Sequence, residues 1–361
     1  MSSLNLQKLS INRFRNLCQV DLSLRPGVNV LYGANGAGKT SVLEAIYFLS
    51  HSRSFKTRNA RHLIKNDEQK FRITGMISEK GYQRRIGVEK SHDGYLGKIN
   101  GIKVRRPSEM ADILPTLVIH PETFNLLTGD PGEKRAFLDW GIFYAEGDFR
   151  RHWQNYQQAL KQRNAALRTS RQRTLITCWD TVLADSGEAI SLLREKYLNS
   201  LVEKLPGLLR TFSEDIDLEL RYRRGWPSGV SLLDQLQGSL ESDLTRGFTQ
   251  SGPQRGGFKT YFNGYETTRV ASRGQLKLVT IILKLAQAQV FLDGNERSCL
   301  LLLDDLDAEL DRKNFERFLA IVEELGLQTV WTTLDKDKFS RTGDTSACLF
   351  HVEHGSIQQM L

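Results

Sequence analysis

Short apolar runs of two kinds alternate along the chain. In the first kind, apolar residues alternate with polar ones or continue for a few positions, which is typical of β-strands. In the second kind they recur every third or fourth residue, which is typical of α-helices. The strand-like runs are residues 4–11, 20–24, 28–32, 71–77, 82–89, 95–104, 117–120, 216–222, 258–266, 299–303, 328–332 and 347–353.

The helix-like runs are residues 41–49, 133–144, 149–170, 175–205, 232–244, 272–292 and 309–325. Pro206 and Gly207 follow one of the longest runs and predict its end. The apolar spacing between residues 133 and 205 drifts and holds no sustained heptad, which favours a packed helical subdomain over a long coiled coil. Asn-Gly pairs at 100–101 and 263–264 predict two tight β-hairpins.

The alternation of strands and helices predicts an α/β fold, with a mainly parallel sheet that carries helices on both faces. With 361 residues, 40% hydrophobic and 25% charged, the chain is long enough for two or three globular domains. It has no run of about 18 apolar residues, and its first residues lack the apolar core of a signal peptide. We therefore expect a soluble, cytoplasmic protein without a transmembrane helix.

The cysteines and the net charge narrow the function only slightly. The four cysteines are scattered without a C-x-x-C pair, and the simplest interpretation is small buried residues in a reducing compartment. The seven histidines form no ligand cluster either. A net charge of +8 suits a polyanionic partner, but many basic proteins bind no nucleic acid, so charge alone is weak evidence.

The segment after the run 28–32 carries the strongest chemical signal. It fits G-x-x-x-x-G-K-[ST] between a strand and a helix, where glycines let the backbone wrap a pyrophosphate and the helix N-terminus directs N–H groups at it. Lys39 then reaches the β- and γ-phosphates of ATP and assists catalysis, and the Thr40 hydroxyl binds Mg²⁺. A Gly-rich turn before an ordinary helix is the alternative. The segment is Gly33, Ala34, Asn35, Gly36, Ala37, Gly38, Lys39 and Thr40.

A second nucleotide signal is the apolar run 299–303, which is followed by Asp304 and Asp305. A buried strand that ends in a carboxylate delivers it to the carboxyl edge of the sheet, where the Mg²⁺ of a bound nucleotide lies. Asp304 is therefore a predicted Mg²⁺ ligand, and Asp305 the predicted general base for the attacking water. A core strand that enters an acidic, solvated turn is the alternative.

A third signal is Ser272, followed by Gly274 and Gln275, at the mouth of a predicted helix. A serine with a nearby glycine at a helix N-terminus can bind an anion, here the γ-phosphate of ATP. An N-cap serine of an ordinary helix is the simpler alternative, and only the order of the three signals argues against it.

The first and second signals are far apart in the sequence, so a large insertion is expected inside a split core. We expect residues 1–127 and 213–361 to form the two halves of one ATPase lobe. Residues 128–212 are expected to form an inserted helical subdomain.

The order of these motifs resembles the ATP-binding-cassette ATPases of the SMC type and, within them, the RecF family of bacterial recombination mediators. The resemblance runs from end to end, and its most specific part is the block Phe137-Leu138-Asp139. The other matching residues are Phe14-Arg15-Asn16, 33–40, Pro121-Glu122, Gly129-Asp130-Pro131, Lys134-Arg135-Ala136, Trp140, Leu160-Lys161-Gln162-Arg163-Asn164, Arg224-Gly225-Trp226, Ser272 to Gln275 and Asp304-Asp305.

The resemblance implies a head that dimerises on ATP, with two ATP molecules between two copies of the chain. The serine motif of one copy would cover the γ-phosphate on the phosphate loop of the other. It also implies DNA binding at gaps or single-strand/duplex junctions and a weak DNA-stimulated ATPase. The implied partners are RecO and RecR, which help to load RecA in replication, gap repair and SOS induction.

The chain departs from the family pattern at three places. Gln254, Gly256 and Gly257 stand where such chains usually show a histidine and an acidic pair. Thr332-Thr333 replace the histidine that follows the last core strand in transporter cassettes. Asp305 stands where most cassettes have glutamate, one methylene longer, so hydrolysis is expected to be slow.

Basic residues cluster at 80–106 and at 150–173, and Arg150, Arg151, Arg163 and Arg168 are expected to contact DNA phosphates. Solvated faces are the alternative for both clusters.

Two other functions remain open. The first is a cassette enzyme that acts on something other than DNA, and the second is a structural head protein that never hydrolyses its ATP.

Overall fold

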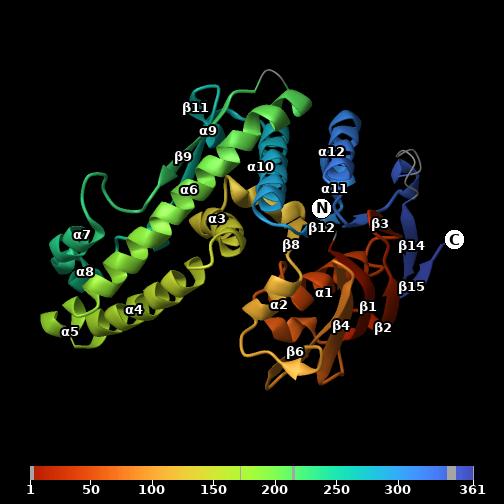
Figure 1. Cartoon of the computed structure of the whole chain (residues 1–361), viewed down its shortest axis with the longest axis horizontal. Helices are drawn as coiled ribbons and strands as arrows, with labels where there is room; N and C mark the ends of the chain where they lie inside the picture. Colours follow the sequence, from red (N-terminus) through yellow and green to blue (C-terminus); the bar gives the residue numbers. More distant parts are fainter. Residues whose placement is uncertain (1–3, 171, 214–215, 340–346, 361) are drawn as a thin grey trace. The chain divides into compact units, whose positions relative to one another are not determined.

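The computed structural model describes residues 4–170, 172–213, 216–339 and 347–360. The chain forms two compact units, residues 1–123 with 295–361 and residues 124–294, and each is described by itself (Figure 1). Residues 213–294, which were expected in the ATPase lobe, group with the helical segment, because their strands and helices pack on its longest helix.

The first unit contains a six-stranded sheet in which five strands are parallel and the edge strand β15 is antiparallel. Its order is β15-β14-β3-β13-β12-β8. Every residue of β12 and β13 is buried, as expected for central strands of a parallel sheet covered on both faces. The strands are β3 (Val28–Tyr32), β8 (Thr116–Ile119), β12 (Leu300–Asp304), β13 (Thr329–Thr333), β14 (Cys348–Glu353) and β15 (Ser356–Gln359).

A second, antiparallel sheet of the first unit has the order β2-β1-β4-β5-β6-β7. The predicted hairpin at Asn100-Gly101 is confirmed, with φ of 49° and 85° at its two turn residues. Lys80-Gly81 makes a similar turn that the sequence pattern did not mark, because lysine seldom adopts positive φ. The strands are β1 (Asn5–Phe14), β2 (Leu17–Ser23), β4 (Lys70–Glu79), β5 (Tyr82–Ser91), β6 (Tyr95–Ile99) and β7 (Ile102–Lys103).

Helix α1 (Lys39–His51) lies between these two sheets, and its apolar residues join one core with both. On the other face of the parallel sheet, Phe315 and Phe318 of α12 meet the Trp331 ring edge-on, each at 5.7 Å between centroids. The expected helices on both faces of a mainly parallel sheet are thus confirmed. The remaining helices of this unit are α2 (Ser108–Ile113), α11 (Leu306–Glu309), α12 (Arg312–Glu324), η1 (Ala60–Leu63) and η4 (Lys336–Phe339), and η2 (Pro121–Leu126) crosses into the second unit.

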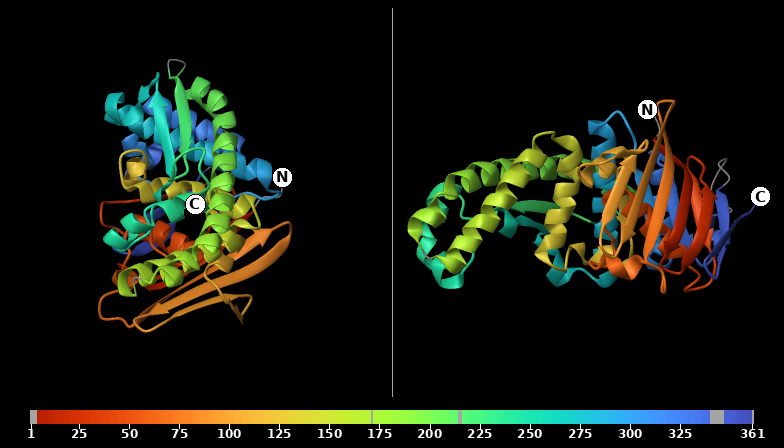
Figure 2. Two further views of the ribbon diagram at one scale, coloured as in Figure 1. Left: turned by 90° about the vertical axis from the view of Figure 1, so that its left-hand side faces the viewer. Right: turned by 90° about the horizontal axis from the view of Figure 1, so that it is seen from below.

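The second unit is organised around α6 (Asp180–Phe212), which packs against α3, α4, α7 and α10. Figure 2 shows α4 and α6 side by side. A three-stranded antiparallel sheet has the order β11-β10-β9. The elements are α3 (Pro131–Ala145), α4 (Phe149–Thr169), α5 (Arg173–Thr177), β9 (Leu218–Arg223), α7 (Leu232–Gly238), α8 (Leu240–Arg246), η3 (Pro253–Arg255), β10 (Gly257–Phe262), β11 (Tyr265–Glu266), α9 (Thr267–Val270) and α10 (Arg273–Gly294).

Several helix boundaries predicted from the sequence are wrong, and two of them are instructive. Helix α6 continues through Pro206 and Gly207 to Phe212. A proline inside a helix costs about 3 kcal/mol, and the buried side chains of Leu205, Leu208 and Phe212 on one face offset that cost. The run 232–244 is instead interrupted after Gly238, so it forms two short helices.

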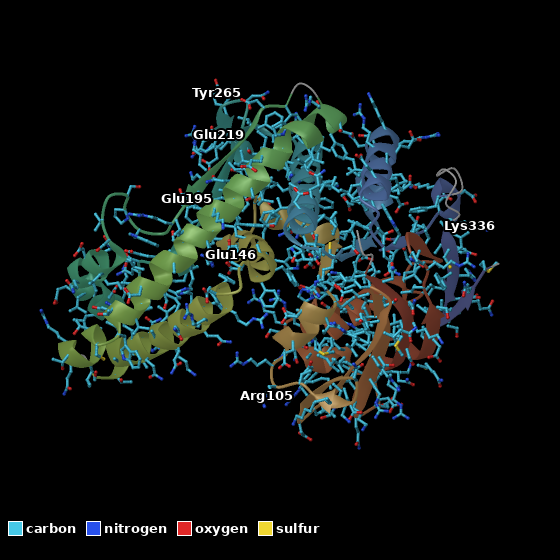
Figure 3. The ribbon with its side chains drawn as sticks, viewed as in Figure 1. Arg105, Glu146, Glu195, Glu219, Tyr265 and Lys336 are labelled. Atoms are coloured by element: carbon cyan, nitrogen blue, oxygen red, sulfur yellow. The ribbon has the colours of Figure 1, made fainter. Side chains whose placement is uncertain are left out.

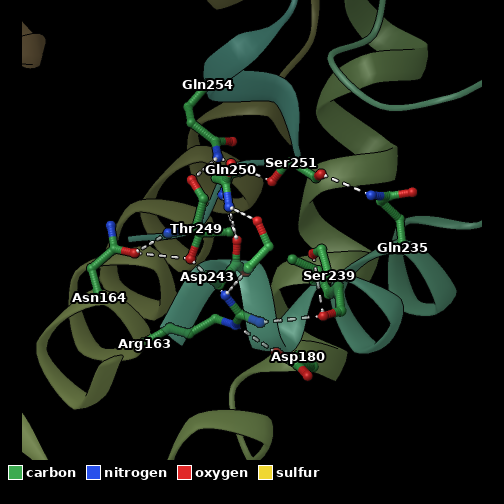
Figure 4. Close-up of polar contacts among 12 residues, drawn as sticks. Arg163, Asn164, Asp180, Gln235, Ser239, Asp243, Thr249, Gln250, Ser251 and Gln254 are labelled. Atoms are coloured by element: carbon green, nitrogen blue, oxygen red, sulfur yellow. Dashed lines mark hydrogen bonds and ion pairs between the residues drawn. The ribbon is translucent and has the colours of Figure 1, made fainter. Parts of the chain in front are cut away.

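Arg163 of α4 is fully buried, so the expectation that it contacts DNA is wrong. Its Nε lies 2.7 Å from Asp180 Oδ1, and its Nη1 lies 2.7 Å from Asp243 Oδ2 and 2.8 Å from Thr249 Oγ1 (Figure 4). A buried guanidinium that is paired and hydrogen-bonded in this way holds elements together, and removing one partner is strongly destabilising. Arg163 therefore connects α4 with α6, α8 and the loop after α8.

Helix α10 is, among the described helices, the one that is long and apolar enough to cross a membrane. However, 67% of its apolar window is buried inside the structure, as in the core helix of a globular unit. The apolar residues of α10 are therefore explained by its packing against α6.

The expectation of buried cysteines holds for two of the four. Cys299 and Cys348 are buried, and burial raises the pKa of Cys299 to about 12. Cys18, on β2, and Cys178, in the turn after α5, are exposed, so for them the expectation is wrong.

Candidate nucleotide-binding site

The phosphate loop, residues 33–40, joins β3 to α1 at the edge where the parallel strands end. A Cβ at Gly33 would overlap the carbonyl oxygen of Val352, and one at Gly38 would lie 3.0 Å from the Leu17 side chain. Both glycines also have φ in the left-handed region, 151° and 118°. These glycines are therefore required by the fold of the loop itself.

Lys39 points its ammonium group into this loop. Its Nζ donates to the carbonyl oxygens of Gly33 at 2.7 Å and Ala34 at 3.1 Å, and the residue is only 5% exposed. An ammonium group has three N–H donors, so one remains for a ligand phosphate. The side chain is thus held in place before any nucleotide binds.

The two nucleotide signals that are far apart in sequence meet in space. The Thr40 hydroxyl at the start of α1 donates to Asp304 Oδ1 at the end of β12, at 2.8 Å. Strand β13 lies between β3 and β12, and its Thr332 hydroxyl lies 2.8 Å from the same carboxylate oxygen. Thr332 also accepts the backbone N–H of Asp305 at 2.9 Å. The structure therefore brings Thr40, Asp304 and Asp305 together through Thr332.

These residues fit the requirements of Mg²⁺. A hydroxyl and a carboxylate oxygen are the ligands that Mg²⁺ prefers, and it usually keeps waters and substrate phosphates for its other positions. In the described part of the chain no three His, Cys, Asp or Glu side chains gather into a metal cage. A magnesium ion would therefore rest on Thr40, Asp304 and the phosphates of the nucleotide.

Asp305 has an unusual backbone and an unusual charge environment. Its φ is 50°, a left-handed conformation that aspartate adopts more readily than most residues. Burial raises the pKa of its carboxyl group, and the neighbouring Asp304 raises it further, against the opposing effect of Lys39. A carboxyl group with a raised pKa is a stronger base when ionised, as expected of a group that takes a proton from water.

The Phe14-Arg15-Asn16 segment supports the phosphate loop through contacts with three residues. Arg15 makes a bidentate ion pair with the buried Glu44 of α1, with both distances 2.8 Å. Asn16 Nδ2 donates to the Gly36 carbonyl at 3.2 Å, and Asn16 Oδ1 accepts from the Ser41 hydroxyl at 2.8 Å. This segment therefore positions the loop and α1 relative to β1.

Sequence reasoning did not assign roles to Thr332, Glu44 and Lys56. Lys56 Nζ lies 3.7 Å from Asp304 Oδ2 and is the nearest cation to that oxygen among the described ion pairs. Thr332 could have been found from the strand pattern alone, because the run 328–332 ends at the same sheet edge as Asp304. No sequence signal marked Glu44 or Lys56, since both are ordinary charged residues outside any motif.

Ser272 is the N-cap of α10 in the second unit. Its hydroxyl accepts the Gln275 N–H at 3.3 Å, and Gln275 Oε1 accepts the Ser272 N–H at 2.8 Å, which is a capping box. The simpler alternative for this serine is therefore present in the structure. Ser272 and Gly274 are both exposed, so the hydroxyl and the helix N-terminus also remain accessible to an anion.

The RecF/RecN/SMC N-terminal domain model matches residues 5–358. The protein named DNA replication and repair protein RecF from Vibrio vulnificus is 37% identical over 98% of this chain and 99% of its own length. The RecF of Thioalkalivibrio sulfidiphilus is 38% identical over the same shares. This chain belongs to the RecF family.

Solved structures agree with this membership. The recombination mediator RecF with ATP, described in the RecFOR pathway, matches with a TM-score of 0.89 and 29% identity, over 99% of this chain and 98% of its own. The Smc head domain of Pyrococcus furiosus matches with a TM-score of 0.60 at 16% identity, over 99% of this chain and 96% of its own, and shows the fold alone. The expected SMC-type ATPase head with inserted helices is confirmed.

Gln254 and Gly256, two of the residues expected to depart from the family pattern, have local structural roles. Gln254 accepts a hydrogen bond from the buried Tyr156 hydroxyl and donates to the Ser251 carbonyl at 3.0 Å. A Cβ at Gly256 would lie 2.8 Å from the Arg223 carbonyl oxygen, so this glycine permits close contact with the end of β9. Gln254 therefore fixes the turn before β10, and Gly256 lets it pack.

Proposed function

We propose that this chain is an ATP-dependent DNA-binding recombination mediator that acts in the cytoplasm in DNA replication, gap repair and SOS induction. It dimerises on ATP, closes on DNA and works with RecO and RecR to load RecA. The observation that carries the proposal is the hydrogen bond between Thr40 and Asp304, because it assembles one nucleotide site from two distant motifs. Family membership supplies the DNA-repair context.

In this proposal the phosphate loop holds the triphosphate of ATP. Its backbone N–H groups and the N-terminus of α1 face the β- and γ-phosphates, and the free N–H of Lys39 completes the contact. Thr40 and Asp304 would hold Mg²⁺, which neutralises charge on the phosphates when bound. Asn16 and Arg15 keep the loop rigid, so little reorganisation is needed on binding.

Asp305 takes the proton of the attacking water. Thr332 accepts its backbone N–H and so fixes the residue at the end of β12. The side chain of aspartate is one methylene shorter than that of glutamate, so the water is held less closely and turnover is slow. Slow hydrolysis suits a protein whose ATP-bound dimer must persist on DNA.

The ATP site is shared between two copies. Ser272, Gly274 and Gln275 of one copy cover the γ-phosphate on the loop of the other, which the exposure of Ser272 at the N-terminus of α10 allows. Such a dimer is symmetric, so both sites form together. The two bound ATP molecules then hold the copies together, and ATP hydrolysis releases the copies from each other.

DNA binding in three nucleotide states tests the proposal. Fluorescence anisotropy of labelled single-stranded, duplex and gapped DNA is measured without nucleotide, with ADP and with a slowly hydrolysed ATP analogue. We expect at least about tenfold tighter binding with the analogue. Only in the ATP-bound dimer can the DNA-binding surfaces of two copies contact the same DNA molecule. Equal binding in all three states would contradict an ATP-gated DNA-binding function.

A further inference from the structure

An open pocket of about 570 Å³ lies in the second unit and belongs to none of the sites above. Its volume falls in the range of ligand sites, roughly 300–1,000 Å³. It is formed by the end of β9, the loop that follows it, the turn at η3 and one residue of α6. The residues that matter for its chemistry are Glu195, Tyr222, Arg223, Arg224, Trp226 and Arg255.

The pocket is built by two backbone segments in close contact. Gly252 N–H donates to the Gly225 carbonyl at 3.3 Å, and a Cβ at Gly225 would overlap the Gly252 carbonyl oxygen. Gly225 also has φ of 98°, which only glycine adopts freely. The buried Arg194 holds the same turn through its Nη1, 2.6 Å from the Pro253 carbonyl oxygen. The wall that carries Arg223 and Arg224 is thereby fixed against the wall that carries Arg255.

Arg224 is anchored in the wall of the pocket. Its Nη2 donates to the carbonyl oxygens of Pro227 at 2.7 Å and Val230 at 2.9 Å, and its guanidinium lies 4.8 Å from the Trp226 ring centroid. Its Nε is buried and has no hydrogen-bond partner among the described residues. A buried guanidinium N–H without an acceptor is costly, so Arg224 Nε is a donor that the described residues leave unused.

The charge of the pocket is strongly positive. Arg223 and Arg255 are both exposed, and neither has a carboxylate within ion-pair distance in the part of the chain that the structure describes. Elsewhere on the surface arginines pair readily, as Arg221 does with Glu219. Among the described lining residues Glu195 is the only acid (Figure 3 labels it on α6). Three guanidinium groups therefore face one carboxylate.

We propose that this pocket binds phosphate groups of a DNA strand. Guanidinium groups bind phosphate oxygens in bidentate pairs and remain charged at every physiological pH. Contacts of this kind go to the backbone, so they are independent of sequence and depend on salt. The choice of DNA over other phosphate carriers rests on the proposed function, since RecF-family proteins are named for DNA replication and repair.

The test uses the full chain with both exposed arginines replaced, Arg223→Gln and Arg255→Gln. The matched control replaces two exposed arginines of the same unit outside the pocket, Arg210→Gln and Arg246→Gln, with the same loss of charge. Affinity for a labelled single strand and a duplex is measured at several salt concentrations. ATP binding to the phosphate loop, measured in parallel, should be unchanged in both double variants.

We expect the pocket variant to bind both DNA forms about tenfold or more weakly. The slope of log K against log salt should fall by about two units, one for each lost phosphate contact. The control should keep the slope and affinity of the parent. Equal effects in the two variants, or none in the pocket variant, would overturn the proposal. If the parent itself binds no DNA, both the proposed function and the pocket assignment fail. If the parent binds DNA and the pocket variant binds it equally well, only the pocket assignment fails.

Two further arms distinguish the source of the phosphate. In a Lys39→Ala background, labelled ATP should bind only with the weak affinity that remains at the phosphate loop. Tight ATP binding that disappears with Arg223→Gln and Arg255→Gln would mean a free nucleotide site instead. DNA with neutral methylphosphonate linkages should lose the pocket-dependent part of the affinity. An oligoglutamate peptide that binds the parent but not the pocket variant, while DNA binds both equally, would assign the pocket to an acidic protein and overturn the assignment to DNA.

Discussion

The Lys39→Ala variant should bind ATP at least about a hundredfold more weakly than the parent, because a charge-assisted hydrogen bond and its electrostatic attraction together contribute roughly 3 kcal/mol. The ammonium group is already fixed by the Gly33 and Ala34 carbonyls, so its loss removes a preorganised contact and not a flexible one. The same variant should fail to dimerise with ATP. Equilibrium titration with a fluorescent ATP analogue measures the first effect, and sedimentation measures the second.

Lys313→Ala is the matched control for this variant. Lys313 is an exposed lysine of α12 in the same unit, so its removal changes the net charge equally without touching the loop. Circular dichroism should show the parental secondary structure for both variants. Normal ATP affinity in Lys39→Ala would contradict the assignment of residues 33–40 as the phosphate loop.

Lys39→Arg keeps the charge but lacks the compact ammonium group, so we expect it to bind ATP and hydrolyse it poorly.

The Asp305→Asn variant should bind ATP normally, hydrolyse it at least about a hundredfold more slowly and accumulate as a dimer. The amide cannot take a proton from water, while Thr40 and Asp304, the proposed Mg²⁺ ligands, are unchanged. Asparagine also tolerates the positive φ of this position, so the backbone at the end of β12 should not move. Steady-state phosphate release and sedimentation with ATP provide the two readouts.

Asp21→Asn, at an exposed position of β2, is the matched control and should behave as the parent in both assays. Parental hydrolysis by Asp305→Asn would show that Asp305 is not the base. Loss of ATP binding in this variant would instead mean that the residue holds the nucleotide or its metal ion. The combination of retained binding, lost hydrolysis and trapped dimer is specific to the proposed role.

The arrangement of the candidate nucleotide site was largely predictable because its parts carry local signals. Residues 33–40 must be glycine-rich to fold closely, and a buried strand that ends in two acids places carboxylates at the sheet edge. The sheet edge then brings Thr40 and Asp304 together, since parallel strands end on one side. Thr332 was given no role because a threonine at a strand end is common, although the run 328–332 places it at the same sheet edge. The strand order then shows that it lies between Thr40 and Asp304.

The helical unit was predicted less well, for reasons of packing. Pro206 is a local signal for a helix end, but the apolar face of α6 continues beyond it and determines the outcome. Arg163 was taken for a surface charge because its neighbours in sequence are basic. Its carboxylate partners, Asp180 and Asp243, come from other helices, so nothing local to α4 reveals its burial. Long-range ion pairs of this kind leave no periodic pattern in a sequence.

Ser272 illustrates a limit of another kind. Its capping box with Gln275 fully accounts for the local sequence, so the structure of one copy gives the serine a sufficient role. A contact between Ser272 and ATP bound to another copy would leave no additional signal in the sequence of one chain. Only an experiment with two copies can separate the cap from the shared site.

Mixing two inactive variants tests the shared ATP site most directly. Lys39→Ala damages the loop and Ser272→Arg the covering motif, so neither alone should dimerise with ATP. In the mixed dimer one site collects both changes and the other collects none. Ser231→Arg, which removes the N-cap of α7 in the same unit, is the control for lost capping and should dimerise by itself.

The measurement is sedimentation of the two variants at equal concentration with ATP and Mg²⁺. If the site is shared, dimer reappears on mixing, and it contains one copy of each variant, because neither variant pairs with itself. If each chain completes its own site, no dimer forms at any ratio of the two variants, and that result would contradict the role proposed for Ser272 and the shared site with it.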